Sequence, residues 1–105
     1  MSELLQVTDA SFAADVEGSK GVLLLDFWAP WCGPCRAMDP ILKQLADENS
    51  QYTIAQINVD ENPETTQSFD VMSIPTFIIF KDGALAQRVS GGMPKAKLLS
   101  VLQAV

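Results

Sequence analysis

The two cysteines of the chain, Cys32 and Cys35, are separated by only two residues. Thiols at this spacing can alternate between a dithiol and a disulfide, and the thiolate is the form that attacks. Pro34 suits the first position of a helix, which would place Cys32 at a helix N-terminus, where the dipole favours a thiolate. Cys35 would lie one turn further on, and Gly33 keeps the approach to the sulfur open. The spacing therefore indicates redox chemistry.

Other uses of a cysteine pair fit this chain less well. A structural zinc site usually needs four Cys or His ligands, but the sequence has two Cys and no His. Iron–sulfur clusters usually need four thiolates, and attachment of a c-type haem needs a His where the chain has Arg36. A purely structural disulfide stays open, although so small a loop would restrict the unfolded chain by only about 2 kcal/mol.

Asp26 interrupts an otherwise apolar run over residues 22–27. A strand buried on both faces should exclude a carboxylate, so this residue needs an explanation. One reading places Asp26 at a sheet edge or at the cap of a turn. The other buries it below the cysteines, where desolvation would raise its pKa and let it exchange a proton with Cys35 near neutral pH.

The elements around these residues alternate between strand and helix. The order βαβαβαββα predicts an α/β protein with a mixed five-stranded sheet and four helices on its two faces, and an Asp-Gly pair at 82–83 predicts a hairpin. We expect strands over residues 4–7, 21–28, 52–59, 76–80 and 85–90, a helix capped by Thr8 or Asp9 that ends at Gly18, and helices over 34–49, 62–69 and 94–103.

The length and net charge of the chain limit the number of domains and the partners that we expect. We expect residues 1–105 to form a single domain. Lys and Arg number 7 against 13 Asp and Glu, which argues against nucleic-acid or anionic-membrane binding. The sequence shows no secretory signal and no apolar run of about 18 residues, so we expect no membrane contact and a cytoplasmic protein.

Several segments resemble thioredoxin over essentially the whole chain: DFWAPWCGPC at 26–35, SIPTF at 73–77, FKDG at 80–83 and the glycine pair at 91–92. The resemblance implies the thioredoxin fold and a thiol–disulfide oxidoreductase that reduces target proteins. It implies that Cys32 is the nucleophile, that Cys35 is the resolving thiol and that Asp26 is a buried carboxylate. It also implies a substrate-binding rim made of Trp31, Ile74, a cis Pro75, Gly91, Gly92 and Met93, with Gly33 and Pro34 inside the motif.

The resemblance further implies how such a protein is used. The dithiol would carry the electrons, so no bound cofactor or metal is expected. A separate thioredoxin reductase, fed by NADPH or by ferredoxin, would recycle the protein, and we expect a monomer that meets disulfide-bearing targets. An oxidase or isomerase on the same fold, and a redox-inert scaffold, are the alternatives. The Gly-Pro pair argues against an oxidase or isomerase, because such relatives typically carry His at the second middle position.

Two positions depart from the pattern of the family. Many relatives carry lysine where we align Gln56, close to the buried carboxylate. Without that cation the charged form of Asp26 is less favourable, so we expect its pKa to lie higher than in a relative with lysine. Ser73 replaces a frequent glycine, for which we expect a small effect on the substrate rim.

Overall fold

Strand β2 (Val22–Trp28) lies at the centre of a five-stranded sheet in the computed structural model, which describes residues 3–105. The other elements are β1 (Leu5–Gln6), the π-helical turn η1 (Ala13–Glu17), α1 (Gly33–Glu48), β3 (Tyr52–Asn58), α2 (Pro63–Ser68), β4 (Thr76–Lys81), β5 (Ala84–Ser90) and α3 (Lys95–Gln103). The strands lie in the order β1-β3-β2-β4-β5. β1 and β2 are parallel to β3, whereas β4 pairs antiparallel with β2 and with β5. The predicted mixed sheet with four helical segments is confirmed.

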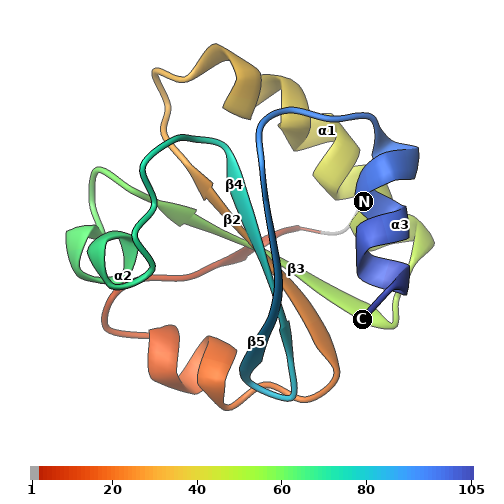
Figure 1. Ribbon diagram of the computed structural model, residues 1–105, viewed down its shortest axis with the longest axis horizontal. Coiled ribbons are helices and arrows are strands. Elements are labelled where there is room, and N and C mark those ends of the chain that lie inside the picture. The colour runs from red at the N-terminus through yellow and green to blue at the C-terminus, as the bar shows by residue number, and fades with distance from the viewer. Residues whose placement is uncertain (1–2) are drawn as a thin grey trace.

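Helical segments cover both faces of this sheet (Figure 1). α1 and α3 pack on the face that carries Leu24 of β2. Leu23 and Leu25 point to the opposite face, because side chains alternate along a strand, and they pack there with Val16 of η1 and Phe69 after α2. Each fully buried leucine of β2 contributes about 1.5–3 kcal/mol relative to an exposed one. The expectation of a strand buried on both faces is confirmed.

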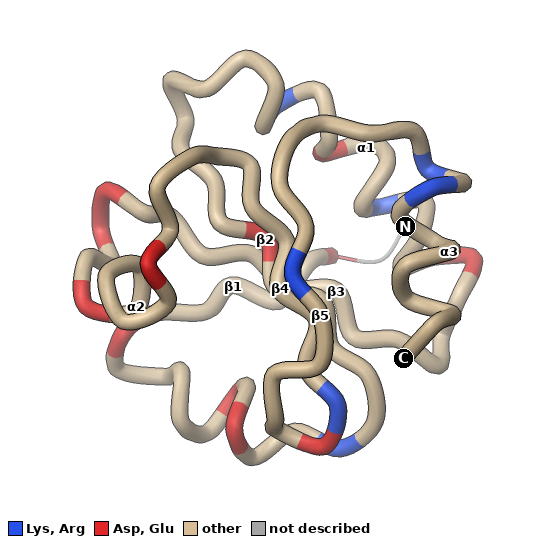
Figure 2. The backbone as a smooth tube through the Cα atoms, in the orientation of Figure 1, with Lys and Arg blue, Asp and Glu red and all other residues tan. Residues whose placement is uncertain are grey.

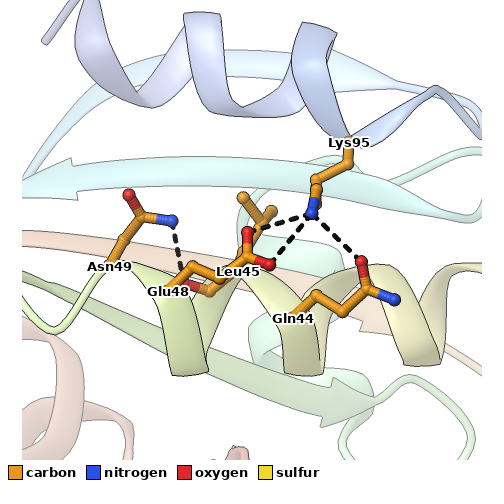
Figure 3. Close-up of polar contacts among 5 residues, drawn as sticks. All are labelled: Gln44, Leu45, Glu48, Asn49 and Lys95. Carbon is orange, nitrogen blue, oxygen red and sulfur yellow. Dashed lines mark hydrogen bonds and ion pairs between the residues drawn. The ribbon is translucent and has the colours of Figure 1, made fainter.

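A charged contact joins α3 to α1 (Figure 3). Lys95 Nζ lies 2.9 Å from Glu48 Oε1 and donates a hydrogen bond to Gln44 Oε1 at 3.1 Å. Both ionic side chains are partly exposed, so the pair contributes at most about 1 kcal/mol. The buried contacts of Leu42 and Leu98 in the same layer therefore hold the two helices on the sheet.

The first helical segment begins later than we expected. We predicted that Thr8 or Asp9 caps it, but the turn follows Phe12 and has no side-chain cap. The Gly18 amide donates to the Ala13 carbonyl oxygen at 2.9 Å, which closes a π-helical turn and ends it at the predicted glycine. Thr8 Oγ1 accepts a hydrogen bond from the Ser11 amide at 3.1 Å, in the turn before η1. Neither predicted residue caps η1 itself, whereas the end at Gly18 is confirmed.

Asp9 caps a different helix, which explains the wrong prediction. Its two carboxylate oxygens accept hydrogen bonds from the Thr65 and Glu64 amides, at 2.9 and 3.2 Å, in the first turn of α2. Asn62, at the local cap position, makes no side-chain cap and instead accepts a hydrogen bond from the Asp9 amide at 2.9 Å. The amides that open α2 are thus satisfied by a residue more than 50 positions away, which no local pattern reveals.

Arg88 on β5 holds the start of the loop that follows α2. Its guanidinium donates to the carbonyl oxygens of Phe69 and Asp70, the latter at 2.9 Å. Asp70 takes a left-handed backbone conformation with φ of 51°. Two donors of one planar group therefore fix the point from which residues 71–75 run towards β4.

The β4–β5 hairpin turns where the Asp-Gly pair predicted. Asp82 and Gly83 have positive φ angles of 50° and 84°, the pattern of a type I′ turn. A Cβ atom at Gly83 would collide with the Glu17 carbonyl oxygen, so the hairpin also packs closely against the end of η1. Gly83 is required both for its backbone conformation and for this approach.

We predict that Gly83→Ala lowers the free energy of unfolding by roughly 3 kcal/mol or more, because backbone strain adds to the collision. Gly21→Ala is the matched control: its φ is also positive, at 73°, but its Cβ would meet no atom within 4 Å. We expect that change to cost about 1 kcal/mol. Urea unfolding of the two variants measures the difference, and equal losses would contradict the packing argument.

Candidate active site

The two cysteines lie at the N-terminus of α1 and form a disulfide, with Cα atoms 5.2 Å apart. Cys32 is the N-cap residue, and its Sγ accepts a hydrogen bond from the Cys35 amide at 3.2 Å. Pro34 lies in the first turn, as predicted. The Cys35 amide and the positive end of the helix thus face the Cys32 sulfur, and both stabilise a thiolate there.

The two cysteine residues, both buried, differ slightly in their exposure to solvent. Cys32 is 6% exposed and Cys35 only 1%. Trp28 and Ala29 pack beneath the pair, whereas Trp31 beside it is 67% exposed. An incoming sulfur therefore reaches Cys32 before Cys35.

The loop before β4 lies against the disulfide. The Ile74–Pro75 peptide bond is cis, as the resemblance implied. The Ile74 carbonyl oxygen lies 3.9 Å from Cys32 Sγ, a van der Waals contact because a disulfide sulfur carries no hydrogen. The Gly91 amide donates to the Pro75 carbonyl oxygen at 2.8 Å. The structure therefore links Cys32, the cis-proline loop and Gly91, and the exposed Gly92 and half-buried Met93 follow directly in the chain.

Asp26 is fully buried in the central strand, which rules out a sheet edge or a turn cap. Figure 2 shows that many of the other Asp and Glu residues lie at the periphery of the fold, around the sheet. Gln56 Nε2 donates to Asp26 Oδ2 at 3.4 Å, which confirms that Gln56 lies close to the carboxylate. Asp26 Oδ1 has no hydrogen-bond partner within residues 3–105.

Burial raises the pKa of the Asp26 carboxyl from 3.8 to about 7. The hydrogen bond from Gln56 lowers this pKa, and the nearby Asp39 carboxylate raises it. A carboxyl group with a pKa near 7 can both accept and release a proton at neutral pH. Asp26 projects towards α1, because it is tied through Gln56 to Asp39, which lies one turn after Cys35 on that helix.

Several neighbours of the site were absent from the sequence prediction. Trp31 Nε1 donates to Asp60 Oδ2 at 2.9 Å, which orients the exposed indole. The sequence did contain a signal for Asp60. Asp60 follows β3 as Trp31 follows β2, and the C-terminal ends of parallel strands meet at one edge of the sheet. Asp39 and Gln6 were also missed. A shallow groove beside the disulfide is lined by Trp31, Val59, Thr66, Val71, Met72, Ser73 and Ile74.

Among the described residues no group of three or more His, Cys, Asp or Glu side chains could hold a metal ion. The redox-active group of the site is the pair Cys32 and Cys35 itself. Within the same residues, no helix is long and apolar enough to cross a membrane.

Comparison with known proteins gives a family match over nearly the whole chain. The family model described as Thioredoxin matches residues 3–104. A thioredoxin of Mycobacterium bovis is 50% identical over 99% of this chain and 90% of its own length. A thioredoxin of Alicyclobacillus acidocaldarius is 49% identical over 94% of this chain and 98% of its own length. A bifunctional thioredoxin reductase/thioredoxin of Mycobacterium leprae is 48% identical over 96% of this chain, which spans 22% of that protein.

We predict that Asp26 makes the protein less stable as the pH rises from about 4 to about 7. The folded-state pKa, about 7, exceeds the ordinary value of 3.8, so the folded state holds the proton more tightly. The stability that this group contributes is complete below the unfolded-state pKa and is lost as the pH rises through the folded-state pKa. Asp26→Asn should therefore match the parent near pH 4 and exceed it at pH 8 by up to roughly 4 kcal/mol.

Urea unfolding of the oxidised proteins at several pH values measures this gain. The exposed Glu61→Gln is a control that also removes one carboxylate, and we expect it to follow the parent at every pH. A gain for Asp26→Asn that is the same at pH 4 and pH 8 would contradict the titration of a buried carboxyl.

Proposed function

The chain belongs to the thioredoxin family and is a thiol–disulfide oxidoreductase, and from this premise we propose a role for each residue of its site. The observation that carries the proposal is the disulfide at the N-cap of α1, with Cys32 as its more accessible sulfur. Cys32 is the attacking nucleophile and Cys35 the resolving thiol. We infer that residues 1–105 form one domain, in agreement with the family match over 3–104.

The reaction proceeds through a mixed disulfide. The Cys32 thiolate attacks one sulfur of a disulfide in a target protein, and the other target sulfur leaves as a thiolate that takes up a proton. Cys35 then gives up its proton and attacks Cys32 Sγ, which forms the internal disulfide and releases the second target sulfur. Two electrons and two protons pass to the target, and the protein is left oxidised.

Asp26 serves as the proton acceptor for Cys35 in the second step. Its pKa of about 7 suits this transfer at neutral pH, because an acid–base group works best when its pKa lies near the working pH. Its burial supports the role, because burying an ionisable group costs free energy, and groups with pKa values perturbed in this way cluster at functional sites.

The rim around Cys32 receives the target protein. Trp31 contributes an exposed apolar surface, and Ile74 and Pro75 present backbone beside the reacting sulfur. Gly91, Gly92 and Met93 form the opposite side of this rim. Gly33 and Pro34, both exposed, leave the sulfur open to a large partner.

The oxidised protein needs a partner that returns two electrons. Thioredoxins work with thioredoxin reductase, and one relative carries both names in a single chain. For this chain we propose a separate thioredoxin reductase, fed by NADPH or by ferredoxin, and disulfide-bearing target proteins. We propose a monomer that carries electrons in the cytoplasm, because a disulfide reductant works where the thiol pool is kept reduced.

We predict that Cys35→Ser accumulates a mixed disulfide between Cys32 and a model target such as oxidised insulin. Serine cannot displace the target sulfur, so the reaction stops after the first step. Non-reducing electrophoresis with mass spectrometry identifies the trapped cysteine. Cys32→Ser is the control and should trap little target, since Cys35 is nearly inaccessible. Equal trapping by both variants would contradict the assigned roles.

We predict that the reduction potential of the Cys32–Cys35 couple lies at the reducing end of the scale for this fold. Known reference couples lie at about −270 mV for thioredoxin and about −180 mV for protein disulfide isomerase. Equilibration with thiol/disulfide buffers of graded ratio measures the value. A potential above about −200 mV would identify a protein that donates disulfides and would overturn the proposed direction of electron flow.

A further inference from the structure

Three polar side chains, one of them the buried Asp26, form a row across the sheet. Gln6 of β1 pairs with Gln56 of β3, and Gln56 pairs with Asp26 of β2. Their alternate neighbours Leu4, Ile54 and Leu24 all belong to the core under α1 and α3, so the row faces the same helices. A polar line therefore runs from the exposed edge strand to the buried Asp26.

Asp39 extends this row from helix α1, which packs on the same face of the sheet. Gln56 Nε2 donates to Asp39 Oδ1 at 3.0 Å and to Asp26 Oδ2 at 3.4 Å. Gln6 Nε2 donates to Gln56 Oε1 at 3.1 Å. A flipped Gln56 amide would turn its oxygen towards two carboxylates and its NH₂ group towards the Gln6 donor, so the contacts favour one orientation.

The Gln56 amide is thus shared unequally between two carboxylates. The contact with Asp39 is 0.4 Å shorter than the contact with Asp26, as the two distances show. Asp39 is half-buried, whereas Asp26 is fully buried. Hydrogen bonds to an ionised acceptor are shorter and stronger than those to a neutral one. The geometry fits a stronger hydrogen bond from the Gln56 amide to Asp39 than to the buried Asp26.

Few other charges face this site. α1 presents Asp39 and Cys35, β3 presents the neutral Gln56, and β4 presents Phe77 opposite Asp26. Lys43, one turn after Asp39, is the basic residue of the groove beside it. Within residues 3–105, no hydrogen bond or ion pair joins Asp26 or Asp39 to a Lys or Arg side chain. How the hydrogen-bond donors are divided between the two carboxyl groups therefore depends mainly on Gln56.

We propose that Asp39 is a positioning residue that draws the Gln56 amide away from the buried Asp26, so that Asp26 keeps its proton closer to neutral pH. Gln6 supports the arrangement by holding the amide oxygen. The consequence for disulfide exchange rests on the proposed role of Asp26 as proton acceptor. The repulsion between the two carboxylates acts in the same direction, because the Asp39 charge also raises the Asp26 pKa.

The test follows the Asp26 carboxyl carbon by NMR during a pH titration of the oxidised protein, with Asp26→Asn to assign the signal. We expect Asp39→Ala to lower the titration midpoint by about 1 unit, because Asp26 loses a repulsive charge and gains the full Gln56 donor. Glu17→Ala removes an exposed carboxylate from η1, which packs on the opposite face of the sheet, and is the control, for which we expect almost no shift.

A second genetic background separates the effect of Asp39 through the Gln56 amide from the effect of its charge. In Gln56→Leu the donor is absent, so Asp39→Ala can act only through its charge, and its shift should fall to less than half. A midpoint unchanged by Asp39→Ala overturns the proposal. A shift of equal size in both backgrounds also overturns it, because the amide would then have no part.

The rate of disulfide reduction against pH separates this proposal from the role of Asp26. If the midpoint falls and the rate profile moves with it, the Asp39 proposal and the role of Asp26 as proton acceptor are both supported. If the midpoint falls and the rate profile stays in place, the Asp39 proposal stands and the proposed proton transfer by Asp26 fails. If the midpoint stays fixed, the Asp39 proposal fails and the role of Asp26 is unaffected.

Discussion

The apolar side chains of strand β2 have to be buried on both faces of the sheet, and this constraint determines where most of the other elements lie. Its leucines alternate between the two sides of the sheet, so one helical layer can bury only half of them. α1 and α3 cover one side, and η1 with the segment after α2 covers the other. The end of β2 then lies under the start of α1, which brings the cysteine pair over the strand that carries Asp26.

The same helix therefore does two different things. Its first turn supplies the amide that faces the Cys32 sulfur, and its second turn supplies Asp39 to the polar row on the sheet. Cys35 and Asp39 are four residues apart and lie on neighbouring positions of one face. The sulfur chemistry and the buried carboxyl are thus fixed by a single rigid element, which limits how far either can move relative to the other.

The sequence predicted the features that depend on local pattern. The apolar run of β2, the Asp-Gly turn and the helix that begins at the cysteines each follow from residues close together in the chain. Asp9 was a wrong prediction for the cap of the first helical segment, because its carboxylate satisfies amides of α2 instead. Asp39 and Gln6 were missed because their significance depends on the phase of a helix and on the register of a parallel sheet. Neither the helix phase nor the strand register can be read from residues close together in the chain. The roles of the rim residues still rest on the resemblance to the family.

The capping of α2 by Asp9 has a consequence for the order of folding. A helix of six residues is too short to be stable alone, and its first amides find their acceptor more than 50 residues earlier in the chain. Closing so long a loop costs entropy before the contact stabilises anything. We therefore expect α2 and the loop after it to consolidate late, after the N-terminal segment has docked beside β3. The loop that faces the reacting sulfur thus depends on a segment that lies more than 50 residues earlier in the chain.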